Sequence, residues 1–411
     1  ATCKRYPLVP DDRDRIAGQL LQAVRENDLV LLSAGSSAGT TDYAEEILKS
    51  SGRLLFHGVG IKPGKPVMMG LVEKVPVIGM PGYPVAAHTV VREFAARLLE
   101  HWGMAPHPAY RVKASLGQTL TSDLGYDEFV PVCTGFVDGK CVAIPLSRGF
   151  GVQSALLRSN GYICIPSTDE GFEAKRDVDV TLYGSPLLLE NCILTVGSQD
   201  IPLDLLADRV ADRGISLRCC PSNNLGSMMA LRSRVCHAAS VHVPVIGGET
   251  VPGFFGAQKD FPISRVVLAE QPLGIASRER LGSGDLQKVR ILNTRRGTAN
   301  RVVLDAYLAK RGIPPTAMEG YTEEVKNPDV IAPRIAARIA DAGICTRRSA
   351  EAAGLAFLPL GTDSYELVMN AGSGEDPRME ELEEEIRSDA YKGRLSAVGG
   401  YDTGNTGVTR K

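Results

Sequence analysis

The stretch that decides the fold runs from residue 28 to residue 84 and contains three loops rich in glycine and proline. It reads DLVLLSAGSSAGTTDY over residues 28–43, GIKPGKPVMMG over 60–70 and VPVIGMPGYP over 75–84. Residues 29–32 form an apolar run without polar alternation, which predicts a strand buried on both faces of a parallel sheet. A strand, a loop of small residues and a helix start predict an anion site, because the unpaired N–H groups of a first helical turn face the ligand.

The first loop carries the groups that an anion site needs. Asp42 follows two threonines and caps a helix that is expected to begin near Tyr43. Backbone N–H groups and small hydroxyl side chains gather just before it, at Gly35, Ser36, Ser37 and Gly39.

The second loop holds Lys62 and Lys65 on either side of a Pro-Gly pair. Proline fixes φ and glycine allows the turn, so both lysines stand on a rigid loop. Solvated surface lysines are the ordinary interpretation, but rigid lysines beside an anion site indicate neutralisation of phosphate charge. The third loop, at Pro81–Pro84, follows the next apolar strand, so three loops leave neighbouring strand ends, where open α/β sheets bind ligands.

An amphipathic helix is predicted ahead of these loops. Ile16, Leu20 and Val24 recur at helical spacing after Pro10. Asp11 stands at the start of this helix, where the helix dipole favours a carboxylate, so a helix cap is its ordinary interpretation.

The composition limits the classes of function. A chain of 411 residues with 44% hydrophobic and 23% charged residues is typical of a globular protein with two or three domains. The net charge of −2 argues against a nucleic-acid binder. No apolar run has the length needed to cross a membrane. The nine cysteines show no zinc-site spacing, which favours a cytoplasmic location.

The three loops together resemble the molybdopterin-binding domain of the MoeA/gephyrin family of molybdenum-cofactor proteins. The order SAGSSAGTTDY, IKPGKP and GMPGYP carries the resemblance. It implies a homodimeric enzyme that inserts molybdenum from molybdate into adenylylated molybdopterin in a reaction dependent on Mg2+. Two positions depart from the family pattern: Tyr83 replaces the asparagine of a PGNP turn, and Gly58 replaces an upstream lysine.

The resemblance also assigns roles to individual residues. Asp11 and Asp42 match acidic positions that would hold Mg2+ or the molybdate-bearing centre, and Lys62 completes the expected catalytic set. Lys65 would neutralise oxyanion or phosphate charge. The other expected contacts with the molybdopterin substrate are Gly35, Ser36, Ser37, Gly39, Pro81, Gly82 and Pro84.

We expect an α/β chain of three parts. Residues 1–106 would form a doubly wound molybdopterin-binding domain that lacks the beginning of the family's domain. Residues 107–184 contain short strands and the segment 147–166, which resembles the small C-terminal β-barrel domain of the family. The family's two N-terminal domains have no counterpart, so the chain resembles the C-terminal part of a molybdopterin molybdotransferase.

The third part, residues 190–411, repeats the pattern of strand, loop and helix three times. Ser198, Ser227 and Thr298 stand at the expected helix starts, where hydroxyl and N–H groups suit a small oxyanion, although each is also an ordinary helix cap. His237 is interpreted as a packing residue, as is His242, rather than as a metal ligand.

This third part resembles the periplasmic-binding-protein-like domain that is fused to MoeA proteins. The matching pieces are VGSQD, NLGSMMAL, NTRRGTANRVVLDAYL and FLPLGTDSYELVM. The resemblance implies two lobes that close on a ligand, with molybdate or tungstate as the natural candidates. The last segment, GYDTGNTGVTRK, is expected to be poorly ordered, although binding-protein relatives pack a similar GYD segment against the first lobe.

Two functions follow from these expectations. The first is a transferase of molybdenum cofactor biosynthesis with a fused oxyanion-binding domain. Because no nucleophilic Ser-His or Cys-His pair stands out, its catalysis would depend on electrostatic positioning. The alternative is a non-catalytic module that senses or delivers molybdate or tungstate, and a scaffold role is a third possibility.

Overall fold

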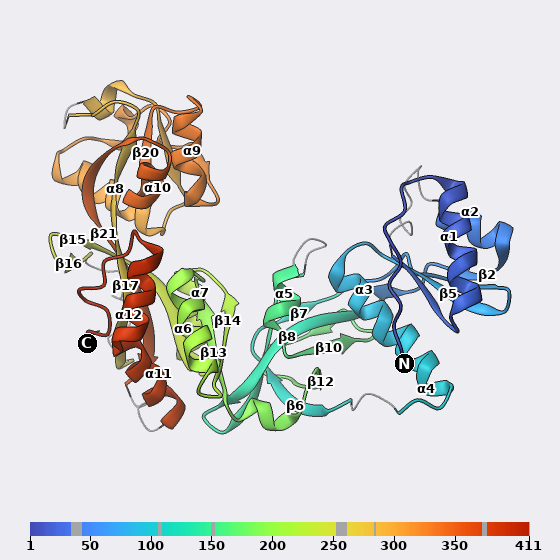
Figure 1. The fold of residues 1–411 in the computed structure, drawn as a ribbon. Helices are drawn as coiled ribbons and strands as arrows, with labels where there is room; N and C mark the ends of the chain where they lie inside the picture. The colour runs from blue at the N-terminus through green and yellow to red at the C-terminus, as the bar shows by residue number, and fades with distance from the viewer. Residues whose placement is uncertain are drawn as a thin grey trace. The chain divides into compact units, whose positions relative to one another are not determined.

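The chain forms two compact units, which Figure 1 shows in a computed structural model. The first unit comprises Ala1–Thr134 with Lys140–Leu189, and the second comprises Gly135–Gly139 with Glu190–Lys411. The expected three-part division stays a prediction. The residues that the structure describes are 1–33, 43–105, 109–148, 153–251, 261–282, 285–371 and 376–410.

The first unit begins with a four-stranded sheet in the order β1-β5-β4-β2. β1 and β5 pair in parallel, whereas β4 pairs antiparallel with both β5 and β2. The α/β class is confirmed, but this sheet is mixed, because the turn at Glu73 and Lys74 joins β4 and β5 as a hairpin. The strands are β1 (Val30–Ser33), β2 (Gly52–His57), β4 (Met68–Val72) and β5 (Val75–Met80).

Helices cover both faces of this sheet. The predicted amphipathic helix is α1 (Arg13–Glu26), whose Leu20 and Val24 are buried beside Ile47 of α2 (Ala44–Ser51). The opposite face packs against α3 (Pro84–Val90) and a π-helical segment (Val91–Ala96), which α4 (Arg97–His101) continues.

The burial predicted for β1 was wrong. Leu31 is 41% exposed, and exposed and partly buried residues alternate along the strand. The reason is its position, since β1 is the edge strand of the described sheet.

A closed five-stranded barrel follows in the same unit, in the order β8-β10-β12-β6-β9, and the pairing of β9 with β8 completes the circle. The short strand β3 (Ile61–Lys62) pairs in parallel with the start of β8, which places the lysine loop beside the barrel. The barrel strands are β6 (Arg111–Leu116), β8 (Asp127–Val137), β9 (Lys140–Pro145), β10 (Gly161–Ile165) and β12 (Asp177–Leu182). The remaining elements are β7 (Leu120–Thr121), β11 (Gly171–Phe172) and α5 (Gln153–Arg158).

The second unit is built on one long mixed sheet in the order β14-β13-β15-β21-β17-β20-β18-β19. Two long antiparallel strands, β17 (Ile263–Ser277) and β21 (Ala356–Asn370), run through two groups of elements that we call the first and second lobe. The first lobe contains β13 (Cys192–Gly197), β14 (Ser216–Pro221), β15 (Ala238–Ile246), β16 (Glu249–Thr250), α6 (Ile201–Ala211), α7 (Asn224–Arg232), α11 (Pro377–Arg387) and α12 (Asp389–Val398). The second lobe contains β18 (Ile291–Thr294), β19 (Glu324–Val325), β20 (Ala342–Thr346), α8 (Ala299–Lys310), α9 (Ile331–Ala336) and α10 (Arg347–Ala352).

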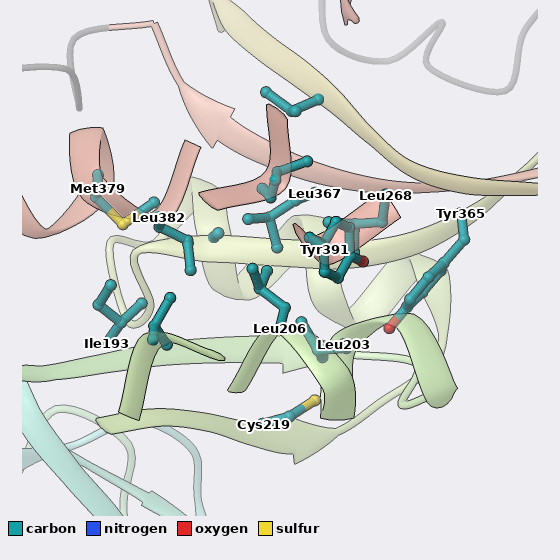
Figure 2. Close-up of a cluster of buried hydrophobic side chains, with 14 of the residues drawn as sticks. Ile193, Leu203, Leu206, Cys219, Leu268, Tyr365, Leu367, Met379, Leu382 and Tyr391 are labelled. Carbon is teal, nitrogen blue, oxygen red and sulfur yellow. The ribbon is translucent and has the colours of Figure 1, made fainter. Parts of the chain in front are cut away.

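The core of the first lobe forms between distant parts of the sequence (Figure 2). Leu206 of α6 packs with Leu382 of α11 and Tyr391 of α12, all of them fully buried. The Tyr391 hydroxyl donates to the backbone carbonyl of Pro202 at 2.9 Å, so the buried ring keeps its polar group satisfied. The late helices therefore complete the lobe that β13 begins.

The last described residues also belong to this lobe. The strand β22 (Thr409–Arg410) pairs antiparallel with β17, and the Arg410 guanidinium donates to Glu366 at 2.7 Å and to Glu270 at 2.9 Å. The prediction of a poorly ordered end was wrong, because these buried carboxylates hold the segment.

The helices and the cysteines bear on membrane insertion and on disulfide bonding. None of the helices in the part of the chain that the structure describes combines the length and the apolar character that spanning a bilayer requires. All nine cysteines are free thiols.

Candidate functional site

A pocket of about 100 Å3 in the first unit brings the lysine loop and the barrel together. Apolar side chains form most of its wall, and Lys62, Glu128 and Arg148 supply its charges. It is lined by Lys62, Pro63, Tyr83, Val85, Ala86, Glu128, Phe129, Pro131, Ser147, Arg148 and Ala155.

Lys62 is positioned in this pocket by an acidic partner. Its ammonium donates to Oδ2 of Asp123 at 2.5 Å, and this hydrogen bond raises the pKa of Lys62 above its ordinary value. Lys65 donates to the Tyr126 hydroxyl at 3.0 Å, and its ammonium lies 5.2 Å from the centre of the Tyr126 ring. The loop therefore presents both lysines as fixed cations on the same side of the barrel.

The barrel contributes an ion pair between a buried carboxylate, Glu128, and an exposed arginine, Arg148. Glu128 is only 6% exposed, and Nη1 of Arg148 lies 3.1 Å from each of its carboxylate oxygens. Arg148 also donates to the backbone carbonyl of Thr121 at 2.5 Å, and the Ser122 hydroxyl donates to Glu128 at 2.7 Å. These bonds fix the Arg148 guanidinium at the pocket wall.

The third loop reaches the pocket through a residue other than those predicted. Pro81 is buried, whereas Gly82 and Pro84 are exposed, and Pro84 is the first residue of α3. Tyr83, the position that departs from the family pattern, is the residue of this turn that lines the pocket.

Of the two expected metal ligands, only Asp11 lies within the described residues. Asp11 is exposed ahead of α1, where its neighbour Asp12 caps the helix by accepting from the N–H of Arg15 at 2.9 Å. No group of three His, Cys, Asp or Glu side chains able to hold a metal ion occurs in the described ranges. The remaining predicted residues, Gly35, Ser36, Ser37, Gly39 and Asp42, lie outside the described residues.

Sequence reasoning missed Glu128, Arg148 and Asp123. The signal for Arg148 was its place in SRGFG, a short glycine-bearing segment at the end of β9, although nothing local connects it with Glu128, which lies 20 residues earlier.

In the second unit, the three hydroxyl residues predicted to bind an oxyanion already take part in internal hydrogen bonds. Ser227 is fully buried and its hydroxyl donates to the carbonyl of Asn223 at 2.7 Å. The backbone carbonyl of Ser198 accepts from the hydroxyls of Ser240 and Tyr365.

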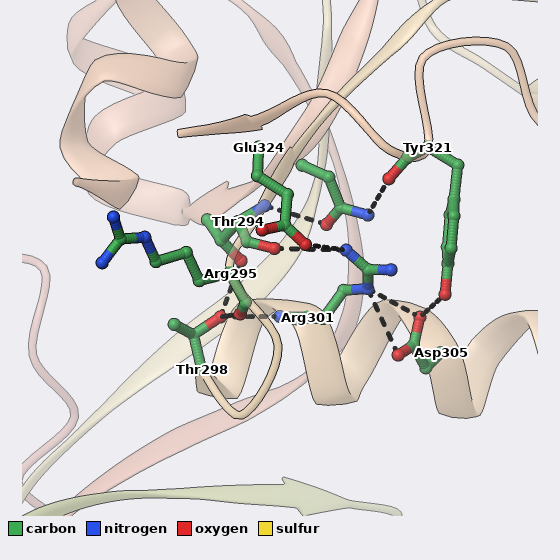
Figure 3. Close-up of polar contacts among 8 residues, drawn as sticks. Thr294, Arg295, Thr298, Arg301, Asp305, Tyr321 and Glu324 are labelled. Carbon is green, nitrogen blue, oxygen red and sulfur yellow. Dashed lines mark hydrogen bonds and ion pairs between the residues drawn. The ribbon is translucent and has the colours of Figure 1, made fainter. Parts of the chain in front are cut away.

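Thr298 is the N-cap of α8 (Figure 3). Its hydroxyl accepts from the N–H of Arg301 and lies 2.7 Å from the Thr294 hydroxyl. The Arg295 side chain extends away from this network in Figure 3, and Arg295 and Arg296 are both exposed. Two exposed guanidinium groups thus precede the start of an α-helix.

The network around α8 is itself rigid. Arg301 is 2% exposed and donates to Asp305, to Glu324 and to the backbone carbonyl of Thr294. Its guanidinium lies 4.0 Å from the centre of the Tyr321 ring, and Figure 3 shows these groups converging beside the helix.

The two histidines of the second unit are held by protein groups. Nδ1 of His237 accepts from the N–H of Leu194 at 2.9 Å, and burial lowers the pKa of His237. Nδ1 of His242 lies 2.8 Å from Oδ2 of Asp363. Burial acts to lower the pKa of His242, but the carboxylates of Asp363, Asp200 and Asp329 together raise it above its ordinary value.

The stability of the second unit is expected to depend on pH through His242. The folded-state pKa lies above the value of about 6.5 found in unfolded chains, so protonation of the imidazole favours folding. This contribution is complete below about pH 6.5 and is lost as the pH rises through the folded-state pKa. In urea unfolding, the advantage of the unmodified chain over His242→Asn should therefore shrink with rising pH.

A matched variant, Asp363→Asn, keeps the imidazole but removes its partner, and should lose the same pH dependence. A stability advantage over His242→Asn that grows as the pH rises would contradict the assignment.

Three family models match successive parts of the chain. Residues 1–101 match a probable molybdopterin binding domain, residues 113–183 match the MoeA C-terminal region (domain IV), and residues 207–387 match a PBP superfamily domain. The resemblance predicted from the sequence is confirmed for all three parts.

Proteins with names in molybdopterin biosynthesis are similar to part of this chain. A putative molybdopterin biosynthesis protein of Methanocaldococcus jannaschii is 35% identical over 179 residues, which cover 44% of this chain and 42% of that protein. A molybdopterin molybdenumtransferase of Staphylococcus aureus is 26% identical, with 46% of each chain covered. The chain thus spans less than half the length of these relatives.

Solved structures are similar to parts of the chain. A molybdopterin biosynthesis MoeA protein of Pyrococcus horikoshii is 27% identical, with 43% of this chain and 42% of that chain covered and a TM-score of 0.37. An ABC-type phosphate transport receptor of Vibrio cholerae is 10% identical, with 51% and 98% covered and a TM-score of 0.39.

Proposed function

We propose that this chain acts in molybdenum cofactor biosynthesis. The proposal is supported by its successive matches to a probable molybdopterin binding domain, the MoeA C-terminal region and a PBP superfamily domain. More specifically, the chain would be part of a molybdopterin molybdotransferase that inserts molybdenum from molybdate into adenylylated molybdopterin. The observation that carries this proposal is the pocket that Lys62 of the lysine loop and Arg148 of the barrel both line.

The chemistry of the pocket suits a substrate with a flat ring and an anionic tail. Phe129, Val85 and Pro131 offer apolar surface to a pterin ring. Lys62 and Arg148 offer positive charge to phosphate or molybdate oxygens, and fixed cations in a partly buried site need no reorganisation when negative charge develops. Glu128 then acts as a positioning residue, since it holds Arg148 in place.

The resemblance implies a Mg2+ ion. The described residues contain no group of three side chains able to hold it, and Asp11 is an exposed carboxylate there. No step of the proposed chemistry is therefore assigned to it. A homodimeric state and a cytoplasmic location remain predictions from the sequence.

The proposal is tested by titrating molybdopterin into the full chain and following the fluorescence of the pterin. Saturable binding is expected, together with molybdenum retained on the pterin, measured by elemental analysis, after adenylylated molybdopterin and molybdate are supplied. A chain that is folded but binds neither form of the pterin would refute the assignment of the pocket. Binding without molybdenum transfer would retain the pocket and remove the transferase activity from this chain.

A second candidate function concerns the second unit, which we propose binds a small ligand between its two lobes. Molybdate and tungstate are the first candidates, and the observation in their favour is the pair of exposed arginines, Arg295 and Arg296, that precede the N-cap of α8. A helix start with two nearby cations is an electrostatically favourable place for an anion.

Molybdate titrated into the full chain is expected to release or absorb heat in a saturable manner, and Arg295→Ala with Arg296→Ala should weaken this binding at least tenfold. Lys310→Ala, at the other end of the same helix, is the matched control. Sulfate that binds as well as molybdate would contradict selectivity, and undiminished binding in the double variant would place the anion elsewhere.

A further inference from the structure

Polar side chains gather where β15, β17 and β21 run side by side. Gln271 of β17 lies opposite Asp363 of β21 in the strand register, and His242 of β15 lies opposite Tyr365. The His242 ring stacks on the Tyr365 ring with 4.6 Å between their centres, while its Nδ1 contacts Asp363 at 2.8 Å. These side chains form the centre of what we call the hinge cluster: Asp200, His242, Gln271, Asp329, Asp363 and Tyr401.

The first lobe adds two members to this cluster. Asp200, the N-cap of α6, accepts from Nε2 of Gln271 at 3.2 Å and from the Tyr401 hydroxyl at 3.1 Å. Burial raises the pKa of Tyr401, and the nearby carboxylates of Asp200 and Asp329 raise it further.

The second lobe contributes Asp329, from a 3-10 helix (Pro328–Val330), and Arg348 of α10. Asp329 acts on both His242 and Tyr401, because its carboxylate contributes to the raised pKa of each. Arg348 lies close to Gly400 and acts on Tyr401 in the opposite direction. Asp329 and Arg348 of the second lobe thus act electrostatically on His242 or Tyr401, and the geometric centre of the hinge cluster is formed by Asp200, Gln271 and Asp363 with their partners.

The buried polar atoms in and beside the cluster that lack a hydrogen-bond partner among the described residues are both acceptors. Oδ1 of Asp363 is buried and has no hydrogen-bond partner among the described residues, and the whole residue is 5% exposed. Oε1 of Gln199, the neighbour of Asp200, is likewise buried without a partner there. Both atoms are acceptors, and a buried acceptor is stabilised by a group that donates to it.

The negative charge of the cluster also favours a ligand that donates hydrogen bonds. Asp200, Asp329 and Asp363 bring three carboxylates, against one guanidinium from Arg348 and the imidazole of His242, which is already paired with Asp363. A bare tetrahedral oxyanion offers acceptors only and would meet carboxylates here.

We propose that the hinge cluster recognises a small organic ligand through a nitrogen group that donates hydrogen bonds, such as an ammonium, a guanidinium or the amidine-type edge of a heterocycle. Asp363 is the principal acceptor, and Asp200 and Asp329 supply the surrounding negative charge. This inference rests on the proposal that the second unit binds a small ligand. For that ligand it favours an organic molecule with a donating nitrogen group over the molybdate and tungstate considered first.

The test is a calorimetric titration of the full chain with two sets of probes. Agmatine and spermidine carry cationic nitrogen groups and neopterin carries a neutral amidine-type edge, while molybdate, tungstate and phosphate represent oxyanions. At least one nitrogen probe is expected to bind at least tenfold more tightly than any oxyanion. Agmatine or spermidine as the tighter ligand would indicate a cationic group, and neopterin would indicate a heterocycle edge.

Variants connect the binding to the cluster. Asp363→Asn is expected to weaken binding of the nitrogen probe at least tenfold. Asp329→Asn changes an exposed residue and is expected to weaken binding of the nitrogen probe several-fold even if Asp363→Asn folds poorly. Asp208→Asn on the exposed side of α6 is the matched control and should leave the affinity unchanged.

Three results would overturn the inference. Tighter binding of an oxyanion than of every nitrogen probe would overturn it while leaving the ligand-binding role of the second unit intact. Nitrogen-probe binding that survives both Asp363→Asn and Asp329→Asn would overturn it in the same way. Failure of every probe to bind the folded chain would overturn both the inference and the ligand-binding role.

Discussion

Glu366→Ala is expected to destabilise the second unit by about 3–5 kcal/mol, the usual cost of removing one partner from a buried ion pair. Glu366 is fully buried on β21 and accepts from Arg265 at 3.1 Å and from Arg410 at 2.7 Å. Arg265 is only 8% exposed, so the variant would remove the Glu366 carboxylate from a guanidinium that lies in the protein interior. Hydrogen exchange of β17 and β21 peptides, measured over a urea series, reports this unit separately from the first.

Two further variants show whether the ion pair is responsible. Glu380→Ala changes an exposed glutamate of α11 and should alter the unfolding free energy by no more than about 0.5 kcal/mol. Replacing both partners, Arg265→Met with Glu366→Leu, should recover much of the loss, because an apolar pair leaves no unpaired charge. If Glu366→Ala lowered the unfolding free energy no more than Glu380→Ala does, the ion pairs of Glu366 would be shown to contribute little to stability.

Lys62→Ala is expected to weaken molybdopterin binding by about 10- to 100-fold, in line with about 1.5–3 kcal/mol for a hydrogen bond to a charged group. Lys62 lines the pocket and its ammonium is fixed by Asp123 at 2.5 Å, so a phosphate or molybdate oxygen meets a cation that is already positioned. Titration of the pterin by fluorescence measures the change directly.

Lys140→Ala removes a lysine from the exposed start of β9 and serves as the matched control for the loss of one positive charge. The affinity of this variant for molybdopterin should equal that of the unmodified chain within twofold at about 0.15 M salt, where long-range charge effects are screened. Equal losses in the two variants would show that net charge, rather than the position of Lys62, governs binding.

The elements that depend on local pattern could be predicted from the sequence. The spacing of Leu20 and Val24 predicted α1, and both side chains are buried against the first sheet. The Pro-Gly loop predicted a fixed position for Lys62, which donates to Asp123 and lines a pocket, while its role at a ligand site stays a prediction. Periodicity and turn chemistry act within a few residues, so one sequence contains this information.

The parts that depend on closure of a sheet or on packing at long range could not be predicted in this way. Arg148 meets Glu128 because the barrel closes, and His242 meets Asp363 across 121 residues of sequence. Leu31 lies in an apolar run, yet the edge position of β1 leaves it exposed, which only the strand order of the sheet determines.

The pairing of β22 with β17 also constrains the order in which the chain assembles during translation. The lobe that begins with β13 (Cys192–Gly197) is finished by Thr409–Arg410, more than two hundred residues later. The elements between β18 and α10 lie close together in the sequence and are able to pack as soon as they leave the ribosome. We therefore expect nascent chains that stop short of residue 409 to hold a folded second lobe and a first lobe whose β17 backbone is still open to pairing with other strands.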